Sequence, residues 1–384
     1  MNNNKIVYFL GAGFSAEAGA PTQNELLKTI LSPEFNTKYQ YNKLISDSII
    51  RLNKFICDIL CIESISYDRI ELETIFTLID KCLNEGYAII GYSYNDLQEI
   101  REILQSLIGL AIHYKTSIVT SIGGNDYIID FANYINRLAS KRAKYKFTNI
   151  DEISVITTNW DIVLDKEFYN IIKNSDYKFP IALDYCCYMS SMTNSENIYI
   201  PGLYALGAGG YNIKYLKLHG SMNWANCPLC QRMYVGFEIN EMNYYNPCYC
   251  RHCRDNYSIK NTETIRLKNN LLLPTFLKDM SNLQIKQVWQ NASIEISEAS
   301  KIVFIGYSLP SADFEIKQLL LRCLRKDVEI EVILYPGKYP DSYECIKNIN
   351  ETKERFYNIF GDRIKQLSFI IQSVPQYVRE KCIE

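Results

Sequence analysis

Short apolar runs alternate with helical periodicity along most of this chain of 384 residues. A mostly apolar run of four to seven residues is long enough for a strand, and it predicts a sheet that is covered on both faces. Such runs lie at Lys5–Leu10, Ile153–Thr157, Tyr215–Leu218, Lys301–Ile305, Glu329–Leu334 and Ser368–Val374. Helical patterns separate several of them, beginning with Asn24–Leu31. The alternation predicts an α/β fold built on a Rossmann-like, doubly wound parallel sheet.

Amphipathic segments interrupt this alternation between residues 36 and 145. Apolar residues recur there at helical spacing in four segments, namely Ile49, Leu52, Ile56 and Leu60, then Ile75, Leu78, Ile79 and Cys82, then Leu97, Ile100, Leu104, Leu107 and Ile108, then Ile128, Phe131, Ile135 and Leu138. We therefore expect a core of residues 1–35 and 146–384, a helical insertion at 36–145, and a cysteine-rich module at 222–262 within the core. Beyond about residue 340 the pattern predicts one helix and one strand.

Composition and charge narrow the function classes. The chain is 47% hydrophobic and 22% charged, with a formal net charge of -2, which is ordinary for a soluble globular protein and does not indicate a nucleic-acid partner. No apolar run reaches the roughly 18 residues that would cross a membrane. The polar start of the chain leads directly into the first strand, so we expect no secretory signal and a cytoplasmic protein with reduced cysteines.

Glycine or polar residues follow four of the predicted strands. They are Gly11–Pro21, Thr158–Asp161, His219–Ser221 and Gly306–Ser308. In doubly wound sheets ligands bind beyond the carboxyl ends of the strands. Glycine lets bare backbone approach a ligand, and the N–H groups that open the next helix can hold a pyrophosphate. Any one of these segments is also explained as a turn, a buried imidazole or a helix cap, but the four together predict a shared nucleotide site.

His219 is the candidate catalytic base. Of the three histidines, His113 lies in an apolar helical segment and His252 lies among cysteines, so only His219 follows a predicted strand. A neutral imidazole can take a proton from a ribose hydroxyl or from water. An amide such as that of Asn159 can orient this water.

Four cysteines have the spacing of a zinc site. Two Cys-x-x-Cys pairs, Cys227 with Cys230 and Cys250 with Cys253, are separated by nineteen residues. This spacing predicts a tetrahedral four-cysteine zinc site. Cys248 and His252 are spare donors, which leaves the ligand set open. Four protein ligands leave no open position on the metal, so we expect a structural zinc ion.

In chain order, the motifs Gly-Ala-Gly-x-Ser-x-x-x-Gly-Ala-Pro, Thr-x-Asn-x-Asp, His-Gly-Ser and Gly-x-Ser resemble those of the sirtuin (silent information regulator) family. The resemblance covers residues 1–35, about 146–340 and the cysteine module. It implies that Asn159 and Asp161 contact the nicotinamide ribose of NAD and a water, with His219 as general base. It also implies that the rest of NAD is held by Gly11, Ala12, Gly13, Ser15, Pro21, Thr22, Thr158, Gly306 and Ser308.

One departure from the family bears on the reaction. Sirtuin deacylases continue the proline with Asp-Phe-Arg, and this phenylalanine shields the sugar cation from water, whereas here Pro21 is followed by Thr22-Gln23-Asn24. The version with a helical insertion is similar to sirtuin-like effectors of bacterial antiphage defence, which destroy NAD. The resemblance therefore implies an NAD glycohydrolase (NADase). The alternatives are an NAD-dependent protein deacylase and a non-catalytic sensor that binds NAD or ADP-ribose.

Partners are expected from the same resemblance and from the helical insertion. Related effectors imply a HerA-type ATPase partner or a phage-derived trigger. The amphipathic segments of residues 36–145 predict a homo-oligomer, because apolar faces that the core does not use find a partner surface. The alternative is that these helices simply pack on each other as an inert lobe. Nothing in the sequence indicates a membrane or a nucleic acid.

Overall fold

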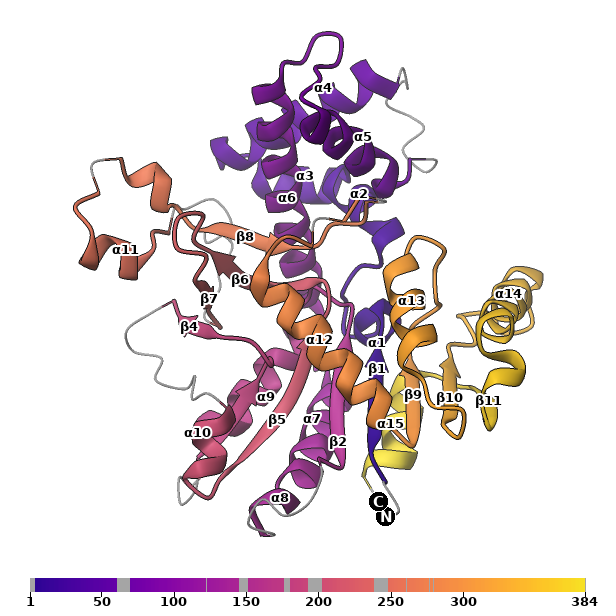
Figure 1. The fold of residues 1–384 in the computed structure, drawn as a ribbon. Helices are drawn as coiled ribbons and strands as arrows, with labels where there is room; N and C mark the ends of the chain where they lie inside the picture. Colours follow the sequence, from indigo (N-terminus) through magenta and orange to yellow (C-terminus); the bar gives the residue numbers. More distant parts are fainter. Residues whose placement is uncertain are drawn as a thin grey trace.

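A seven-stranded parallel sheet forms the centre of the molecule in a computed structural model (Figure 1). The structure describes residues 4–60, 70–121, 123–144, 151–175, 180–192, 202–237, 248–259, 261–275, 277–278 and 280–383. Every neighbouring pair in this sheet is parallel. In spatial order the strands are β11 (Gln366–Ile371), β10 (Glu329–Leu334), β9 (Lys301–Ile305), β1 (Ile6–Leu10), β2 (Ile153–Thr157), β5 (Tyr211–Lys217) and β3 (Ile181–Asp184).

The strand register aligns the predicted functional loops. Leu10 at the end of β1 pairs with Thr157 of β2 and with Ile305 of β9, and Thr157 pairs with Lys217 of β5. The four carboxyl ends therefore lie in one row. In Figure 1 this row faces the helices in the upper part of the molecule. The four segments that the sequence singled out begin side by side.

Helices cover both faces of the sheet, as the uninterrupted apolar strands require. On one side α7 (Asp126–Ala139) packs between α9 (Val163–Asn174) and α15 (Val374–Cys382). On the other side α13 (Phe314–Cys323) packs between α12 (Leu283–Glu298) and α14 (Tyr343–Phe360). The doubly wound α/β fold class is confirmed. Shorter helices are α1 (Ala12–Ala16), α8 (Lys141–Lys144) and α10 (Gly202–Gly207).

A second hydrophobic core lies among the helices at the carboxyl edge (Figure 1). Its helices are α2 (Gln23–Ile30), α3 (Pro33–Tyr39), α4 (Lys43–Leu60), α5 (Leu72–Glu85) and α6 (Tyr94–Ser121). The fourth amphipathic segment behaves differently, because Ile128, Phe131 and Ile135 of α7 belong to the core of the main sheet. The helical core thus begins earlier in the chain than residue 36 and, in the described part of the chain, α6 is its last helix.

A small second sheet carries the cysteine module. Its order is β4 (Met189–Ser191), β7 (Met233–Val235), β6 (Gly220–Asn226) and β8 (Lys268–Leu271). Beside it lie α11 (Arg251–Asn256) and a short 3-10 helix at Thr262–Ile265. A second 3-10 helix, Gly361–Arg363, lies elsewhere in the chain, between α14 and β11. The zinc-binding module of the expected fold therefore has its own small sheet.

Two sequence predictions need correction. β5 begins at Tyr211, earlier than the expected Tyr215, because the polar Lys214 is ion-paired inside the fold with Asp151 and Glu295 and does not end the strand. The last strand is Gln366–Ile371 and not Ser368–Val374, and helix α15 follows it. Among the described helices, none is both long and apolar enough to span a membrane.

Three glycines let the loops after β1 and β9 touch backbone to backbone. Gly13 N donates to the Gly306 carbonyl oxygen (2.9 Å), and Gly11 N donates to that of Ile305 (3.0 Å). A Cβ at Gly306 would lie 2.2 Å from the Phe14 nitrogen, and its φ of +64° already disfavours other residues. This close approach of the two backbones explains the glycines structurally, in addition to the nucleotide-binding role that the sequence predicts for them.

We expect Gly306→Ala to lower the free energy of unfolding by about 2–5 kcal/mol, through an overpacked contact added to a left-handed backbone. Gly86→Ala is the matched control, since Gly86 has a φ of +73° and a Cβ added there would have no described atom within 4 Å. It should cost only about 1 kcal/mol. Urea unfolding of both variants measures the difference. Equal losses would contradict the backbone contact.

Candidate active site

The loop after β2 is fastened to the loop after β1 by Thr157 and Asn159. The Thr157 hydroxyl donates to the Leu10 carbonyl oxygen (3.1 Å) and accepts the Asn159 backbone N–H (3.0 Å). The Asn159 amide nitrogen donates to the Gly11 carbonyl oxygen (2.9 Å) and to the Ser15 hydroxyl oxygen (3.2 Å). Asn159 Oδ1 is buried and has no hydrogen-bond partner among the described residues. The side chain is thus fixed with its acceptor unused.

Ser15 joins Asn159 to Asp161. The Ser15 hydroxyl accepts from Asn159 and forms a second hydrogen bond with the Asp161 carboxylate. Asp161 Oδ1 also accepts the Val163 N–H (3.1 Å), which holds the carboxylate at the start of α9. Burial raises the pKa of the Asp161 carboxyl, although the Lys217 ammonium acts to lower it. Three predicted site residues therefore form one hydrogen-bonded group.

A buried ion pair between β5 and α9 supports the loop that carries Asn159 and Asp161. Lys217, the last residue of β5, is fully buried and lies 2.8 Å from Asp165 of α9. Its ammonium also donates to the backbone oxygen of Asp161 (2.6 Å). The Tyr185 hydroxyl donates to the other oxygen of Asp165 (2.7 Å). Removing one partner from such a buried pair typically costs about 3–5 kcal/mol, so the loop that carries Asn159 and Asp161 rests on a rigid support.

His219 lies on the neighbouring strand end with one ring nitrogen unused. The side chain is buried, and it forms a hydrogen bond with the Thr158 backbone. Nε2 is buried without a partner in the part of the chain that the structure describes. The pKa of His219 is lowered to about 4, first by burial and also by Lys278, against the raising effect of Asp313. The imidazole is therefore neutral at physiological pH and offers a lone pair.

A charged cluster on the side of β9 contributes to the field at His219. Lys278 is buried and lies 3.2 Å from Asp313 and 3.1 Å from Glu315. Asp313 also accepts the Tyr307 hydroxyl (2.8 Å). Asp313 and Glu315 act to raise the pKa of His219, whereas Lys278 acts to lower it, so the carboxylates and the ammonium have opposite effects on a positive charge at this ring.

The remaining predicted contacts to NAD differ in exposure. Ala12 and Ser308 are exposed, whereas Gly13, Thr158 and Gly306 are half-buried at the row of strand ends. The helix after the glycine loop, α1, has only five residues. Within this turn the Gly13 N–H donates to the Gly306 carbonyl oxygen and the Phe14 N–H to that of Gly11 (2.9 Å each), so these two N–H groups are already engaged inside the protein. The contact of the predicted residues with NAD stays a prediction.

The four predicted zinc ligands come together. The sulfur atoms of Cys227, Cys230, Cys250 and Cys253 all lie within 4.8 Å of one another. The Sγ distances of 3.9 Å (Cys227 to Cys253) and 3.7 Å (Cys230 to Cys250) fit a tetrahedron with Zn–S bonds of about 2.3 Å. These residues can hold a structural zinc ion that joins the two Cys-x-x-Cys loops.

The spare donors lie outside the four-sulfur cluster. Cys248 is exposed and is not among the four clustered sulfurs. His252 Nδ1 lies 3.4 Å from the Asn256 amide nitrogen. Within the described residues, the geometry favours the four cysteines as the ligand set, and their binding of zinc stays a prediction.

Sequence reasoning missed the residues that support the site. Lys217 lies within an apolar strand, and a lysine in such a run indicates a buried ion pair, which could have been recognised. Lys278 and Asp313 carry no comparable pattern, because they meet only when the segment after β8 crosses to the loop after β9.

Comparison with known proteins gives only weak likenesses. No family model matches this chain, and no curated protein matches it at a significant level. Among solved structures, Sir2Tm bound to a propionylated peptide is 13% identical with a TM-score of 0.34, over 98% of this chain and 91% of that one. Sir2 bound to acetylated peptide is 12% identical with a TM-score of 0.35, over the same shares. Likenesses at this level carry no argument, so the roles of the residues rest on this chain's own geometry.

We expect purified protein to contain about one zinc ion per chain and Cys227→Ser to lose it, with destabilised or insoluble protein, because structural zinc contributes directly to folding. Cys248→Ser is the control, since this exposed thiol lies outside the cluster. Metal analysis and thermal unfolding measure both effects. A well-folded wild type without zinc, or equal effects of the two substitutions, would refute the assignment.

Proposed function

We propose that the chain binds NAD at the row of strand ends and hydrolyses the bond between nicotinamide and ribose, giving nicotinamide and ADP-ribose. The observation that carries the proposal is a pair of unused acceptors, Asn159 Oδ1 and His219 Nε2. Both are buried, and both lie on adjacent strand ends beside the glycine loop. Buried acceptors without partners cost free energy, and a bound substrate and water would supply the missing donors.

Cleavage of the bond between nicotinamide and ribose requires a well-oriented water more than a strong nucleophile. As the C1′–N bond breaks, its electron pair neutralises the pyridinium nitrogen, and C1′ becomes cationic until a water oxygen attacks it. Asn159 Oδ1 would accept one hydrogen of this water. His219 Nε2 would accept a proton from the water or from a ribose hydroxyl. Positioning of this kind and electrostatic stabilisation account for much of enzymatic catalysis.

The segment after Pro21 supports hydrolysis over deacylation. Here the chain enters helix α2 at once, and the Thr22 N–H and hydroxyl both donate to Glu25 (2.8 Å each). The apolar side chains of α2, such as Leu26 and Leu27, are buried in the helical core. A helix anchored in this way supplies no aromatic cover of the kind that shields the sugar cation in deacylases. Water then reaches C1′.

The biological setting of the proposal rests on the motif resemblance. We propose an effector that depletes NAD in bacterial antiphage defence and acts as a homo-oligomer. A HerA-type ATPase or a phage-derived trigger would release its activity. Such control is needed, because an NADase that is always active would kill its host.

Incubation of purified protein with NAD tests the reaction class. We expect nicotinamide and ADP-ribose in equal amounts without any peptide. Nicotinamide release only in the presence of an acylated peptide would support the deacylase alternative. NAD binding without release of nicotinamide would support the sensor. Either of these two results would contradict the NADase proposal.

His219→Gln should lower the rate of NAD cleavage by about 10²–10⁴-fold, the usual contribution of a general base. His252→Gln is the matched control, because this half-buried histidine lies in the cysteine module. Its rate should match wild type. Chromatographic measurement of nicotinamide compares the two variants, and near-wild-type turnover in His219→Gln would show that the base is wrongly assigned.

A further inference from the structure

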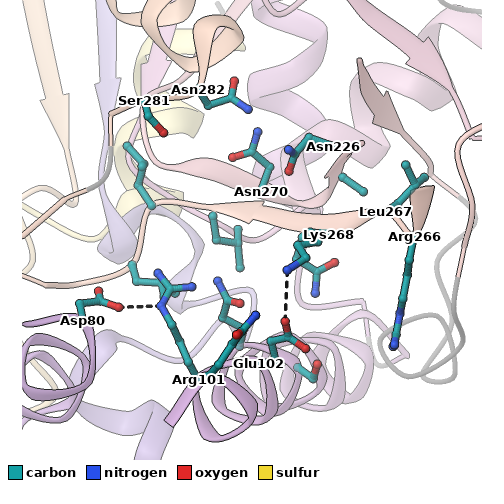
Figure 2. Close-up of a pocket in the computed structure, with 18 of the residues that line it drawn as sticks. Asp80, Arg101, Glu102, Asn226, Arg266, Leu267, Lys268, Asn270, Ser281 and Asn282 are labelled. Carbon is teal, nitrogen blue, oxygen red and sulfur yellow. Dashed lines mark hydrogen bonds and ion pairs between the residues drawn. The ribbon is translucent and has the colours of Figure 1, made fainter. Parts of the chain in front are cut away.

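A cleft of about 660 Å³ opens between the helical core and the second sheet, apart from the strand ends (Figure 2). Its walls come from α5 and α6 on one side and from β6 and β8 on the other. The volume is in the range of sites that hold small molecules. Neither the zinc site nor the proposed NAD site uses this cleft.

Arg101 presents a planar fork to the cleft. Its Nε donates to Asp80 at 2.6 Å, and the Asp80 side chain is only 7% exposed. This bond fixes the guanidinium from α6, and Figure 2 shows the group directed toward the strand on the far wall. Among the described residues, its two terminal nitrogens have no hydrogen-bond partner. A held guanidinium with a vacant outer edge suits a phosphate or a carboxylate.

A second, independent feature is the side-chain amide of Gln105, one turn further along α6. Gln105 lines the cleft and is only 8% exposed. No hydrogen bond joins its side chain to another described residue. The enclosed polar atoms that lack a partner do not include its amide atoms, so solvent or a ligand in the cleft can reach the Gln105 amide. A ligand with polar groups beyond its anion would satisfy it.

The charge balance of the walls limits the ligand. Lys268 faces Glu102 at 3.5 Å, and Arg266 faces Glu263 at 3.6 Å. These pairs are about half exposed and contribute little to stability. When Arg101 and Asp80 are added, the charged side chains that line the cleft sum to zero. Recognition of an anion therefore depends on the Arg101 guanidinium and not on the overall charge of the cleft. A neutral lining favours one anionic group over a polyphosphate.

One residue connects this cleft to the candidate base. Leu272 lines the cleft, and its N–H donates to the backbone oxygen of His219 (2.9 Å). The Leu272 carbonyl oxygen accepts the indole N–H of Trp160 (3.2 Å), next to Asn159. A ligand that shifts this segment therefore shifts the backbone at both His219 and the Asn159 loop.

We propose that the cleft binds a small metabolite with a single phosphate or carboxylate, held by Arg101 and Gln105, and that this ligand regulates the strand-end site through Leu272. Binding itself is independent of the proposed function. The regulatory part rests on it. Three probes test which parts of a ligand the cleft recognises. Inorganic phosphate has the anion alone, ribose 5-phosphate adds a sugar, and adenosine 5′-monophosphate adds a sugar and a base.

Calorimetric titration of the full chain without NAD tests binding. We expect at least one probe to bind, and Arg101→Lys to weaken it tenfold or more, because lysine keeps a cation beside Asp80 but lacks the fork. Gln105→Leu should weaken the two sugar phosphates. Arg51→Lys is the matched control: Arg51 pairs with Glu99 between α4 and α6, outside the cleft, and should bind as wild type does.

The outcomes are distinguishable from those of the proposed function. Absence of binding by all three probes, or equal affinity in wild type and Arg101→Lys, overturns the site whether or not NAD is cleaved. With binding established, nicotinamide release is compared with and without the bound probe. A change of at least threefold in wild type, absent in Arg101→Lys, supports regulation. An unchanged rate overturns the coupling through Leu272.

Discussion

The contact between two loop backbones, Gly11–Gly13 after β1 and Gly306 after β9, is the constraint on which the rest of the site depends. No side chain fits between them, since a Cβ at Gly11 would lie 2.6 Å from a Gly306 atom and one at Gly13 would lie 2.8 Å away. The contact fixes the Gly11 carbonyl oxygen and Ser15, which are the two groups that the Asn159 amide donates to. The orientation of the candidate catalytic amide thus follows from a glycine contact on the opposite side of β1.

Buried contacts then hold the other candidate catalytic side chains in place. The buried Lys217–Asp165 pair holds the loop of Asp161, and the hydrogen bond with Thr158 orients His219. Asn159 Oδ1 and His219 Nε2 are left without a partner among the described residues, and so is Ser221 Oγ, two residues after His219. Two unused acceptors on side chains that the fold already holds in place resemble a preorganised site, in which the reorganisation cost is met during folding.

The sequence predicted the parts that depend on local pattern. Buried parallel strands have apolar runs, so Ile153–Thr157, Lys301–Ile305 and Glu329–Leu334 were predicted to the residue, and cysteine spacing predicted the four-sulfur cluster. Patterns failed where stability comes from distant partners: Lys214 continues β5 because of Asp151 and Glu295, and α15 is held against α7. The pairing of Lys278 with Asp313 likewise depends on the path of the chain in space.

The most direct test of the central claim is the protonation of His219, followed by nitrogen NMR of ¹⁵N-histidine-labelled protein. Three histidines make the spectrum tractable, and His219→Gln assigns the signal. Because burial lowers the pKa to about 4, we expect the ring to stay neutral from pH 8 to about 5. We also expect its unprotonated Nε2 signal to shift when NAD is added. A ring that titrates near its ordinary pKa of about 6.5, or a signal that NAD leaves unchanged, would contradict the account.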